Sequence, residues 1–369
     1  MRVLVTDGET KKALAAVRAL AATADEVGVA SRFPVSVGGA SRFADRRHWL
    51  HEREPGALVA ALNRLGERGY DHLLPVAGRT FEMVSEHRDR LAFPVERILP
   101  DREAMRTALS KPSVDALARS TGVPSPATVS LTDQWGIDTA LGTVGTPAVV
   151  KARTEAEPRF VRVVHSREEL ATARREYVAS RGAAPLVQEY LPGVGRGFFG
   201  LYVDGELLEG YAHRRIREYP PEGGASACAA SERDEQLREY SRRLLEPLEW
   251  TGVAMVEFKE DAGGTPRLIE INPKLWGSLD LTVASGLNFP AALVELSAGA
   301  DPSALEFEFA PRRVHWPLSG DLSHAWRRPG SAPAVARDLL SRETGSNLRL
   351  DDPLPHAVEA AVTLVRRDA

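Results

Sequence analysis

Two carboxylates and one amide fall close together in a part of this sequence that is typical of two adjoining strands. Glu257 lies in the apolar run VAMVEF, and Glu270 and Asn272 lie two residues apart in RLIEIN. Because alternate residues of a strand share a face, Glu270 and Asn272 project from the same side. Residues 259–266 between the runs contain Asp, Gly and Pro, which predicts a tight hairpin connection. The hairpin is expected to bring Glu257 beside the other two side chains.

Oxygen-donating side chains without Cys or His suit Mg²⁺, an ion that keeps several waters and is usually shared with substrate phosphates. Glu257 and Glu270 are surrounded by Val, Met, Phe, Leu and Ile. A carboxylate in such a setting is costly unless a cation or hydrogen bonds compensate it. The alternative is an ordinary set of charged strand residues with cross-strand partners, in which case the acidic hairpin is incidental. The metal interpretation predicts phosphate chemistry.

The length, net charge and cysteine count of the chain exclude several classes of protein. With 369 residues the chain exceeds the size at which one core keeps growing, so two or three domains are expected. A net charge of -4 argues against a general nucleic-acid binder. The single cysteine, Cys228, excludes a disulfide within the chain and favours a cytoplasmic location. No run approaches the roughly 20 apolar residues that span a bilayer. Small-molecule ligands are therefore expected, with no nucleic acid and no membrane.

The first hundred residues alternate strand and helix patterns, which predicts a parallel sheet covered by helices. Ligands of such sheets bind at the carboxyl ends of the strands, here near Asp7, Gly8 and residues 77–80. Further along, helices are expected over residues 102–122, 166–181, 234–248 and 284–299, a hairpin turn at Asp204-Gly205, and a closing strand over residues 357–365.

Several cationic side chains stand at positions where they could reach phosphates. Lys151 ends the apolar strand pattern TPAVVK, and Lys111 precedes Pro112 in what fits a first helical turn. Lys151 alone is more readily explained as an exposed residue that ends a strand, and only together with the metal site do the lysines indicate phosphate binding. The basic run from His213 to Arg217 precedes a glycine pair and is expected to form a loop over a site.

A glycine pattern that resembles a dinucleotide-binding fingerprint occurs at Gly195, Gly197 and Gly200. The residues after it alternate as a hairpin does and do not open a helix, so the fingerprint lacks its required context. These glycines are expected to mark a strand where backbone passes close to another group.

In their order and spacing the motifs resemble those of the ATP-grasp superfamily, over about residues 1–300. The matching segments are Lys111 ahead of a helix ending in GVPSP, Lys151 at the end of TPAVVK, QEYLPG, HRRIREYPPEGG, and EF followed by IEINPK. The resemblance implies a mixed α/β and α+β fold, in which an N-terminal Rossmann-like (pre-ATP-grasp) domain precedes a two-lobed ATP-grasp fold. The implied units are residues 1–103, a lid over 104–184, a metal and nucleotide lobe over 185–300, and an extension over 301–369.

The resemblance also implies roles for individual residues. Lys111 and Lys151 would contact the phosphates of ATP, and Gln188, Glu189 and Leu191 would line the adenine pocket. Glu257, Glu270 and Asn272 would hold Mg²⁺. Arg215 and Lys274 would face the γ-phosphate and the acyl substrate. Substrate selection would involve the N-terminal domain, Arg214, Arg217 and residues 276–281.

The implied activity is that of an ATP-dependent carboxylate-amine ligase, which forms an amide through an acyl phosphate and releases ADP and phosphate. Its partners would be a small-molecule carboxylate and amine, and a homodimer is compatible with the sequence. Three departures favour an alternative, an ATP-binding ATP-grasp protein with weak or no ligase activity. The stretch RTEAEPRF lacks the family's glycine-rich flap, Val194 and Gly195 stand where a ribose-binding glutamate is common, and Lys274 replaces an arginine.

Overall fold

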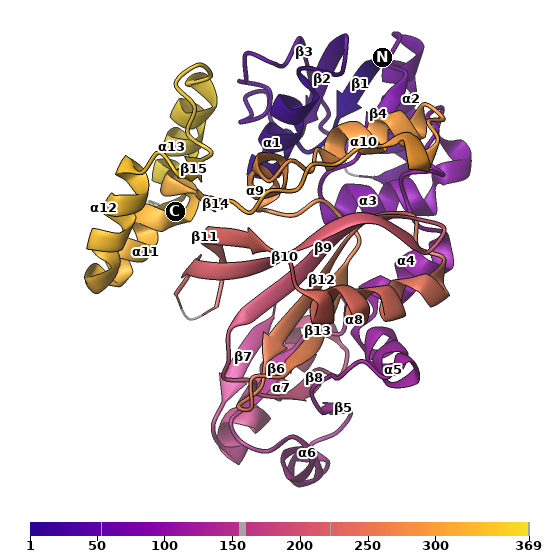
Figure 1. Cartoon of the computed structure of the whole chain (residues 1–369). Coiled ribbons are helices and arrows are strands. Elements are labelled where there is room, and N and C mark those ends of the chain that lie inside the picture. Colours follow the sequence, from indigo (N-terminus) through magenta and orange to yellow (C-terminus); the bar gives the residue numbers. More distant parts are fainter. Residues whose placement is uncertain (53, 155–159, 222, 368–369) are drawn as a thin grey trace.

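The computed structural model of the chain describes residues 1–52, 54–154, 160–221 and 223–367. Its strands form three sheets, in the orders β3-β2-β1-β4, β5-β8-β6-β7 and β13-β12-β9-β10-β11-β14-β15. Figure 1 shows the first sheet at the top of the molecule, the long strands of the large sheet below it, and the smaller second sheet at the bottom. The predicted combination of α/β and α+β architecture is confirmed.

The N-terminal sheet is parallel throughout, as its alternating pattern predicts. Its strands and helices are β1 (Arg2–Val5), α1 (Lys11–Leu20), β2 (Glu26–Ser31), β3 (Arg46–Trp49), α2 (Pro55–Glu67), β4 (His72–Leu74) and α3 (Gly78–Glu86). Strand β3 is absent from the prediction because RRHW is polar and mostly exposed, as an edge strand can be.

Residues 102–122, predicted as one helix, form α4 (Arg102–Leu109) and α5 (Lys111–Thr121). Ser110 separates them with an extended ψ of 107°, and its side chain accepts a hydrogen bond from the N–H of Ser113. Pro112 has no N–H to continue the hydrogen-bond ladder of α4. Lys111 is therefore the first residue of a new helix, as predicted, and α5 ends at Gly122 with a φ of 66°.

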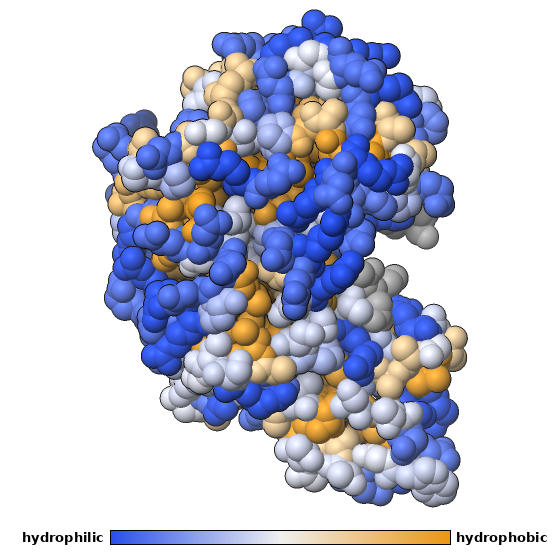
Figure 2. All heavy atoms as spheres, turned by 90° about the vertical axis from the view of Figure 1, so that its right-hand side faces the viewer, coloured by the Kyte–Doolittle hydropathy of each residue, from blue (hydrophilic) through white to orange (hydrophobic). Residues whose placement is uncertain are grey.

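The second sheet and its two helices form a separate lobe. Figure 2 shows this lobe projecting below the rest of the molecule, with an indentation on one side between them. Its elements are β5 (Thr128–Ser130), α6 (Ile137–Val144), β6 (Ala148–Lys151), β7 (Val161–Val164), α7 (Arg167–Arg181) and β8 (Leu186–Glu189). Ser166 caps α7 as predicted, because its side chain accepts from the N–H of Glu169.

The large sheet begins with antiparallel neighbours. Its first elements are β9 (Gly195–Val203), β10 (Glu206–Tyr219), β11 (Ala225–Glu232), α8 (Glu235–Leu245), β12 (Gly252–Glu260) and β13 (Pro266–Asn272). The predicted turn at Asp204-Gly205 connects β9 to β10, and both residues have positive φ, 49° and 84°. The glycine pattern in β9 thus lies in a hairpin, and the rejection of the dinucleotide fingerprint is confirmed.

The helix predicted over residues 284–299 is α10 (Phe289–Ser297), which begins five residues later than predicted, and a further helix, α9 (Leu279–Ala284), precedes it. Gly286 separates them, with a φ of 85° that disfavours other residues. Helix α10 lies against β4 (Figure 1), where Ser297 and the His72 ring lie 3.0 Å apart. The chain thus returns to cover the N-terminal sheet after the β12–β13 hairpin.

The C-terminal residues extend the large sheet and carry three helices on its far side (Figure 1). The elements are β14 (Arg313–His315), α11 (Leu322–Arg327), α12 (Ala332–Leu340), β15 (Thr344–Ser346) and α13 (Leu354–Arg367). The strand predicted over residues 357–365 is wrong, because these residues lie in α13. Pro355 and Glu359 are buried four residues apart, the spacing of a helix face, and the alanines favour a helix.

In the ranges that the structure describes, no helix has the length and apolar character needed to cross a membrane.

Candidate nucleotide and metal site

The predicted hairpin is formed by β12 and β13, and it places the three candidate metal ligands on neighbouring strands. Glu257 is directly opposite Glu270 in the register, and a bulge follows Glu257. Asn272 is buried, and its Nδ2 donates a hydrogen bond to Glu270 Oε1 at 3.0 Å. Because directly opposite residues of a pair share a face, the two carboxylates and the amide lie on one side of the sheet.

Each carboxylate of the hairpin has a cation beside it. Arg215 Nη2 donates to Glu257 Oε2 at 3.0 Å, and Lys111 Nζ lies 3.7 Å from Glu270 Oε2. Both carboxylates keep about a fifth of their surface exposed, 21% for Glu257 and 20% for Glu270. These pairs offset the cost of holding the carboxylates in the sheet.

The donor set fits Mg²⁺ and does not resemble a closed protein cage. Within the described ranges, no three or more His, Cys, Asp or Glu side chains converge as a metal cluster would require. Two carboxylates and an amide oxygen remain, and Mg²⁺ is commonly held by one or two carboxylates plus waters and substrate phosphates. The residues therefore fit a metal that arrives together with a nucleotide.

The two candidate phosphate-binding lysines lie at the junction of the small lobe and the hairpin. Lys151, at the end of β6, is buried, and its Nζ donates to Gln188 Oε1 at 2.9 Å. Gln188 Nε2 donates in turn to Thr128 Oγ1 at 2.8 Å. Lys111, Lys151 and Gln188 line one cavity of about 10 Å³, which has room for a single water.

The other two residues predicted for the adenine pocket continue from β8. The Glu189 carboxylate accepts from the N–H of Ala127 at 3.1 Å, which ties it to the strand partner of β8. Leu191 is buried at 3% exposure. Just beyond, the N–H of Gly193 donates to the carbonyl of Glu260 at 3.0 Å, so this segment joins the small lobe to the end of β12.

The basic run lies inside strand β10, so the prediction that it forms a loop over a site is wrong. His213 is buried, its ring stacks on Phe199 with centroids 4.9 Å apart, and burial and the nearby Arg215 lower its pKa to about 3. It is therefore a neutral core residue at physiological pH. Arg214 is half exposed and 3.7 Å from Glu232.

Arg217 does not face the candidate site, which contradicts its predicted part in substrate selection. Its guanidinium is 6% exposed and donates to both oxygens of Asp321, at 2.5 and 2.7 Å. It also donates to Asp338 in α12 at 2.5 Å. The residue links the large sheet to the C-terminal extension. Trp276, in the other predicted selection segment, is likewise buried in the core at 2% exposure.

Lys274 reaches the start of helix α3 in the N-terminal part of the chain. A Cβ added at Gly78, the first residue of α3, would lie 3.1 Å from Lys274 Cδ and 3.2 Å from its Nζ. Beside it is Lys12, which was not predicted as a site residue because it is one of two adjacent lysines at the start of an amphipathic helix. Lys12 Nζ donates to the carbonyl of Leu275 at 2.8 Å. Burial and the nearby Lys274 lower the pKa of Lys12 to about 7.

Lys12→Met is expected to stabilise the protein at neutral pH, because it removes an ammonium from a buried position. Between pH 7 and 10 the unfolded chain keeps the Lys12 proton and the folded chain has lost it, so this residue makes stability rise with pH. In the variant this rise is absent, and at pH 7 it is more stable by about 2–4 kcal/mol. Urea unfolding at pH 7, 8.5 and 10 measures the difference, which should shrink toward pH 10. A constant difference would contradict the titration of Lys12.

The glycine-free stretch that departs from the family pattern includes residues 155–159, which lie outside the described residues.

Comparisons with known proteins agree with this architecture. A family model described as ATP-grasp in the biosynthetic pathway with Ter operon matches residues 183–316. The fold is similar to that of a biotin carboxylase from Campylobacter jejuni in complex with β-γ-ATP, with a TM-score of 0.68, 17% identity, and coverage of 85% of this chain and 74% of that one. A comparison with curated protein sequences gives no match.

Two further solved structures are similar over most of their length. An L-amino acid ligase from Bacillus licheniformis has a TM-score of 0.66 and 16% identity, with 85% of this chain and 78% of that one covered. An N5-carboxyaminoimidazole ribonucleotide synthetase from Thermus thermophilus has a TM-score of 0.64 and 17% identity, with 84% and 81% covered. The resemblance to the ATP-grasp superfamily is confirmed, and the fold is a Rossmann-like N-terminal unit followed by a two-lobed ATP-grasp body.

Proposed function

We propose that the protein is an ATP-dependent carboxylate-amine ligase that uses Mg²⁺. The observation that carries the proposal is the pairing of candidate phosphate-binding cations with candidate oxygen ligands in one place. Arg215 is held by Glu257, Lys111 by Glu270, and Lys151 by the amide oxygen of Gln188. In a complex with Mg·ATP these cations would contact the phosphates, and Glu257 and Glu270 would hold the metal.

The reaction has two steps, phosphoryl transfer to the carboxylate and then formation of the amide. An oxygen of the substrate carboxylate attacks the γ-phosphorus of ATP, the bond to the bridging oxygen breaks, and ADP leaves with the electron pair. The amine nitrogen then attacks the acyl carbon, loses a proton to solvent, and expels phosphate. Lys111, Lys151 and Arg215 neutralise the negative charge of the transferred group, and Lys274 orients it against the N-terminal sheet. Mg²⁺, which Glu257, Glu270 and Asn272 would hold, would supply positive charge that stabilises the transferred phosphoryl group.

Each domain expected from the sequence has a role in this reaction. Residues 104–184 act as the lid that closes on the nucleotide, and residues 185–300 supply the metal ligands. Residues 1–103 hold the acyl substrate. The adenine lies against Gln188, Glu189 and Leu191, where the segment after β8 joins the two lobes.

The proposal is tested by ADP release from Mg·ATP in the presence of pooled carboxylic acids and a supplied amine. Release that depends on one acid pool is the expected result. Melting temperature with and without Mg·ATP is measured in parallel, because a ligand of the native state must raise it. An absent nucleotide shift would overturn the ATP site itself.

The second candidate, an ATP-binding protein without ligase activity, rests on the glycine-free stretch RTEAEPRF after Lys151. It predicts a clear Mg·ATP-dependent rise in melting temperature together with ADP release that no acid or amine increases. The same two measurements therefore separate the two functions.

A further inference from the structure

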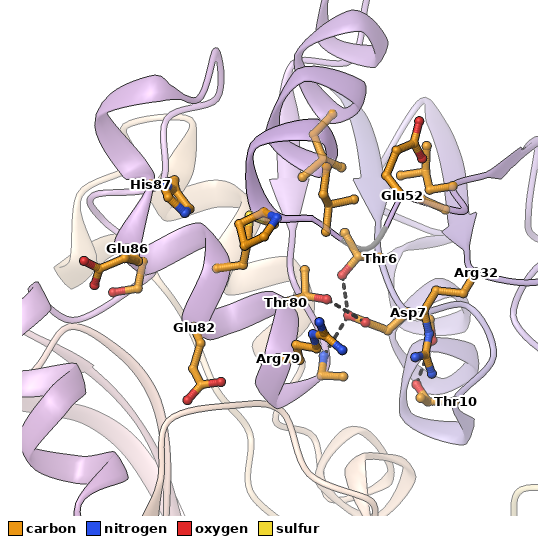
Figure 3. A pocket seen from close by; sticks show the side chains of 18 of the residues that line it. Thr6, Asp7, Thr10, Arg32, Glu52, Arg79, Thr80, Glu82, Glu86 and His87 are labelled. Atoms are coloured by element: carbon orange, nitrogen blue, oxygen red, sulfur yellow. Dashed lines mark hydrogen bonds between the residues drawn. The ribbon is translucent and has the colours of Figure 1, made fainter. Parts of the chain in front are cut away.

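A pocket of about 620 Å³ lies in the N-terminal part of the chain, at the carboxyl ends of β1, β2 and β4. It shares no lining residue with the small cavity between Lys111 and Lys151. Figure 3 shows that it extends from Asp7 and Thr80 to Glu86 and His87, so it runs along α3. Its apolar wall comes from the residue after β3 and from α2, α3 and α4, and it includes Leu50, Leu58, Leu62, Met83, Met105 and Leu109.

One end of the pocket is next to the proposed site of phosphoryl transfer. Asp7 fixes the start of α3 at this end of the pocket. Its carboxylate accepts hydrogen bonds from the N–H of Ala77 at 2.8 Å and from Thr80 Oγ1 at 2.7 Å (Figure 3). Between Ala77 and Thr80 lies Gly78, against which the Lys274 side chain packs. A carboxylate at this end of the pocket would therefore lie beside Lys274.

Arg79 is the cation that this end offers to an anion. Three other arginines line the pocket, and each pairs with a carboxylate. The pairs are Arg32 with Glu9, Arg102 with Asp89, and Arg106 with Glu86. Arg79 is exposed, and within the part of the chain that the structure describes it has no hydrogen-bond or ion-pair partner. Figure 3 shows it beside Asp7 and Thr80.

The dimensions set a minimum size for the ligand. Thr80 and His87 are separated by about 10 Å along α3 at the 1.5 Å rise of a helix. The volume falls within the roughly 300–1,000 Å³ of pockets that enclose drug-sized molecules. Bicarbonate or a single small amino acid would leave the apolar wall uncovered. At the far end, the Glu86–Arg106 pair and His87 offer polar partners.

We infer that this pocket holds the body of the carboxylate substrate, and that this substrate is an elongated amphipathic acid larger than a free amino acid. The inference rests on the proposed function. The carboxylate binds at the Arg79 end, next to Lys274, and the apolar body lies along α3 against the leucines and methionines. Specificity for the acyl substrate then comes from burial of its apolar surface.

Calorimetric titration of the full chain with octanoate, acetate and alanine tests this assignment. Octanoate is expected to bind at least tenfold more tightly than either small acid. Arg79→Ala should weaken octanoate binding at least tenfold, and Leu58→Trp, which fills the pocket without removing a charge, should do the same. Arg97→Ala removes an exposed arginine elsewhere and should leave octanoate binding unchanged.

Mg·ATP binding is also measured on every variant. A failure of the proposed acid-binding pocket can then be distinguished from a failure of the proposed ligase function. Loss of octanoate binding with unchanged Mg·ATP binding supports the pocket. Equal binding of octanoate, acetate and alanine, or no binding of any of them, would overturn it even if ATP binds. Octanoate binding that Arg79→Ala and Leu58→Trp leave intact would place the acid elsewhere. Octanoate binding without any ATP binding would retain the pocket and overturn the ligase.

Discussion

Glu270→Gln is expected to lower Mg·ATP-dependent ADP release by about 10²-fold or more. Gln keeps the shape of the side chain and an acceptor for Asn272 Nδ2, which donates to it at 3.0 Å. It removes the negative charge that a hard divalent cation requires. A metal supplies several kcal/mol of charge stabilisation in the transition state, and each 1.36 kcal/mol is a factor of ten in rate.

The measurement is ADP release against Mg²⁺ concentration at a fixed ATP concentration. In Glu270→Gln the Mg²⁺ dependence should shift to higher concentration as the rate falls. Glu306→Gln is the matched control, because Glu306 is exposed and outside the site, and it should behave as the wild type. A wild-type rate and an unchanged Mg²⁺ requirement in Glu270→Gln would mean that the metal is held by other residues.

Local sequence patterns predicted the elements around the site well, because each depends on nearby residues. Lys111 opens a helix next to Pro112, and the hairpin that carries Glu257 and Glu270 follows from strand alternation around a turn. The same local patterns gave a wrong prediction for the C-terminal segment. The valines of residues 357–365 suggest a strand, but the alanines between them favour the helix that forms, α13.

The sequence did not predict which distant residues each cationic side chain contacts. The arginines at 215 and 217 lie two residues apart on one strand, but one contacts Glu257 and the other Asp321. A bulge in the pairing of β10 with β11 lies between them, and no residue type in the run signals it. Lys12 and Lys274 meet although 262 positions separate them, because α1 packs beside the segment that follows the hairpin. Which partner each of these arginines and lysines contacts therefore depends on the arrangement of the strands and helices more than on the local sequence motif.

Arg217→Met is expected to destabilise the protein by about 3–5 kcal/mol, the usual cost of removing one partner from a buried ion pair. Asp321 is fully buried and Asp338 is 4% exposed, and both lose the guanidinium that donates to them. His315 Nδ1, 3.1 Å from Asp321, and Arg313, 2.6 Å from Asp338, remain as partial compensation. Because α11 and α12 are attached through these two carboxylates, the C-terminal extension should loosen first.

The dependence on pH distinguishes this charge effect from a simple loss of packing. Burial raises the pKa of Asp321, but His315 and Arg217 outweigh it and hold the pKa below its ordinary value. Such a group stabilises the fold above its unfolded pKa, and this contribution is lost as pH falls through the folded value. In wild type this loss begins only below about pH 3.8. In Arg217→Met the buried carboxylate has lost the guanidinium, so burial favours its protonated form, and the variant is expected to gain relative stability as pH falls from 7 toward 4, which narrows the difference from wild type.

Urea unfolding of both proteins at pH 7 and pH 4.5 measures that narrowing. Arg214→Met is the matched control from the same strand, because Arg214 is half exposed and only 3.7 Å from Glu232, and such pairs contribute about 0–1 kcal/mol. A double variant, Arg217→Met with Asp321→Asn, should recover part of the loss by removing the unpaired buried charge. If Arg217→Met costs no more than Arg214→Met, the network is not what holds the extension to the sheet. A large loss that the double variant partly reverses would assign residues 317–340 a structural role in fixing strand β10, the strand from which Arg215 reaches Glu257 in the candidate metal site.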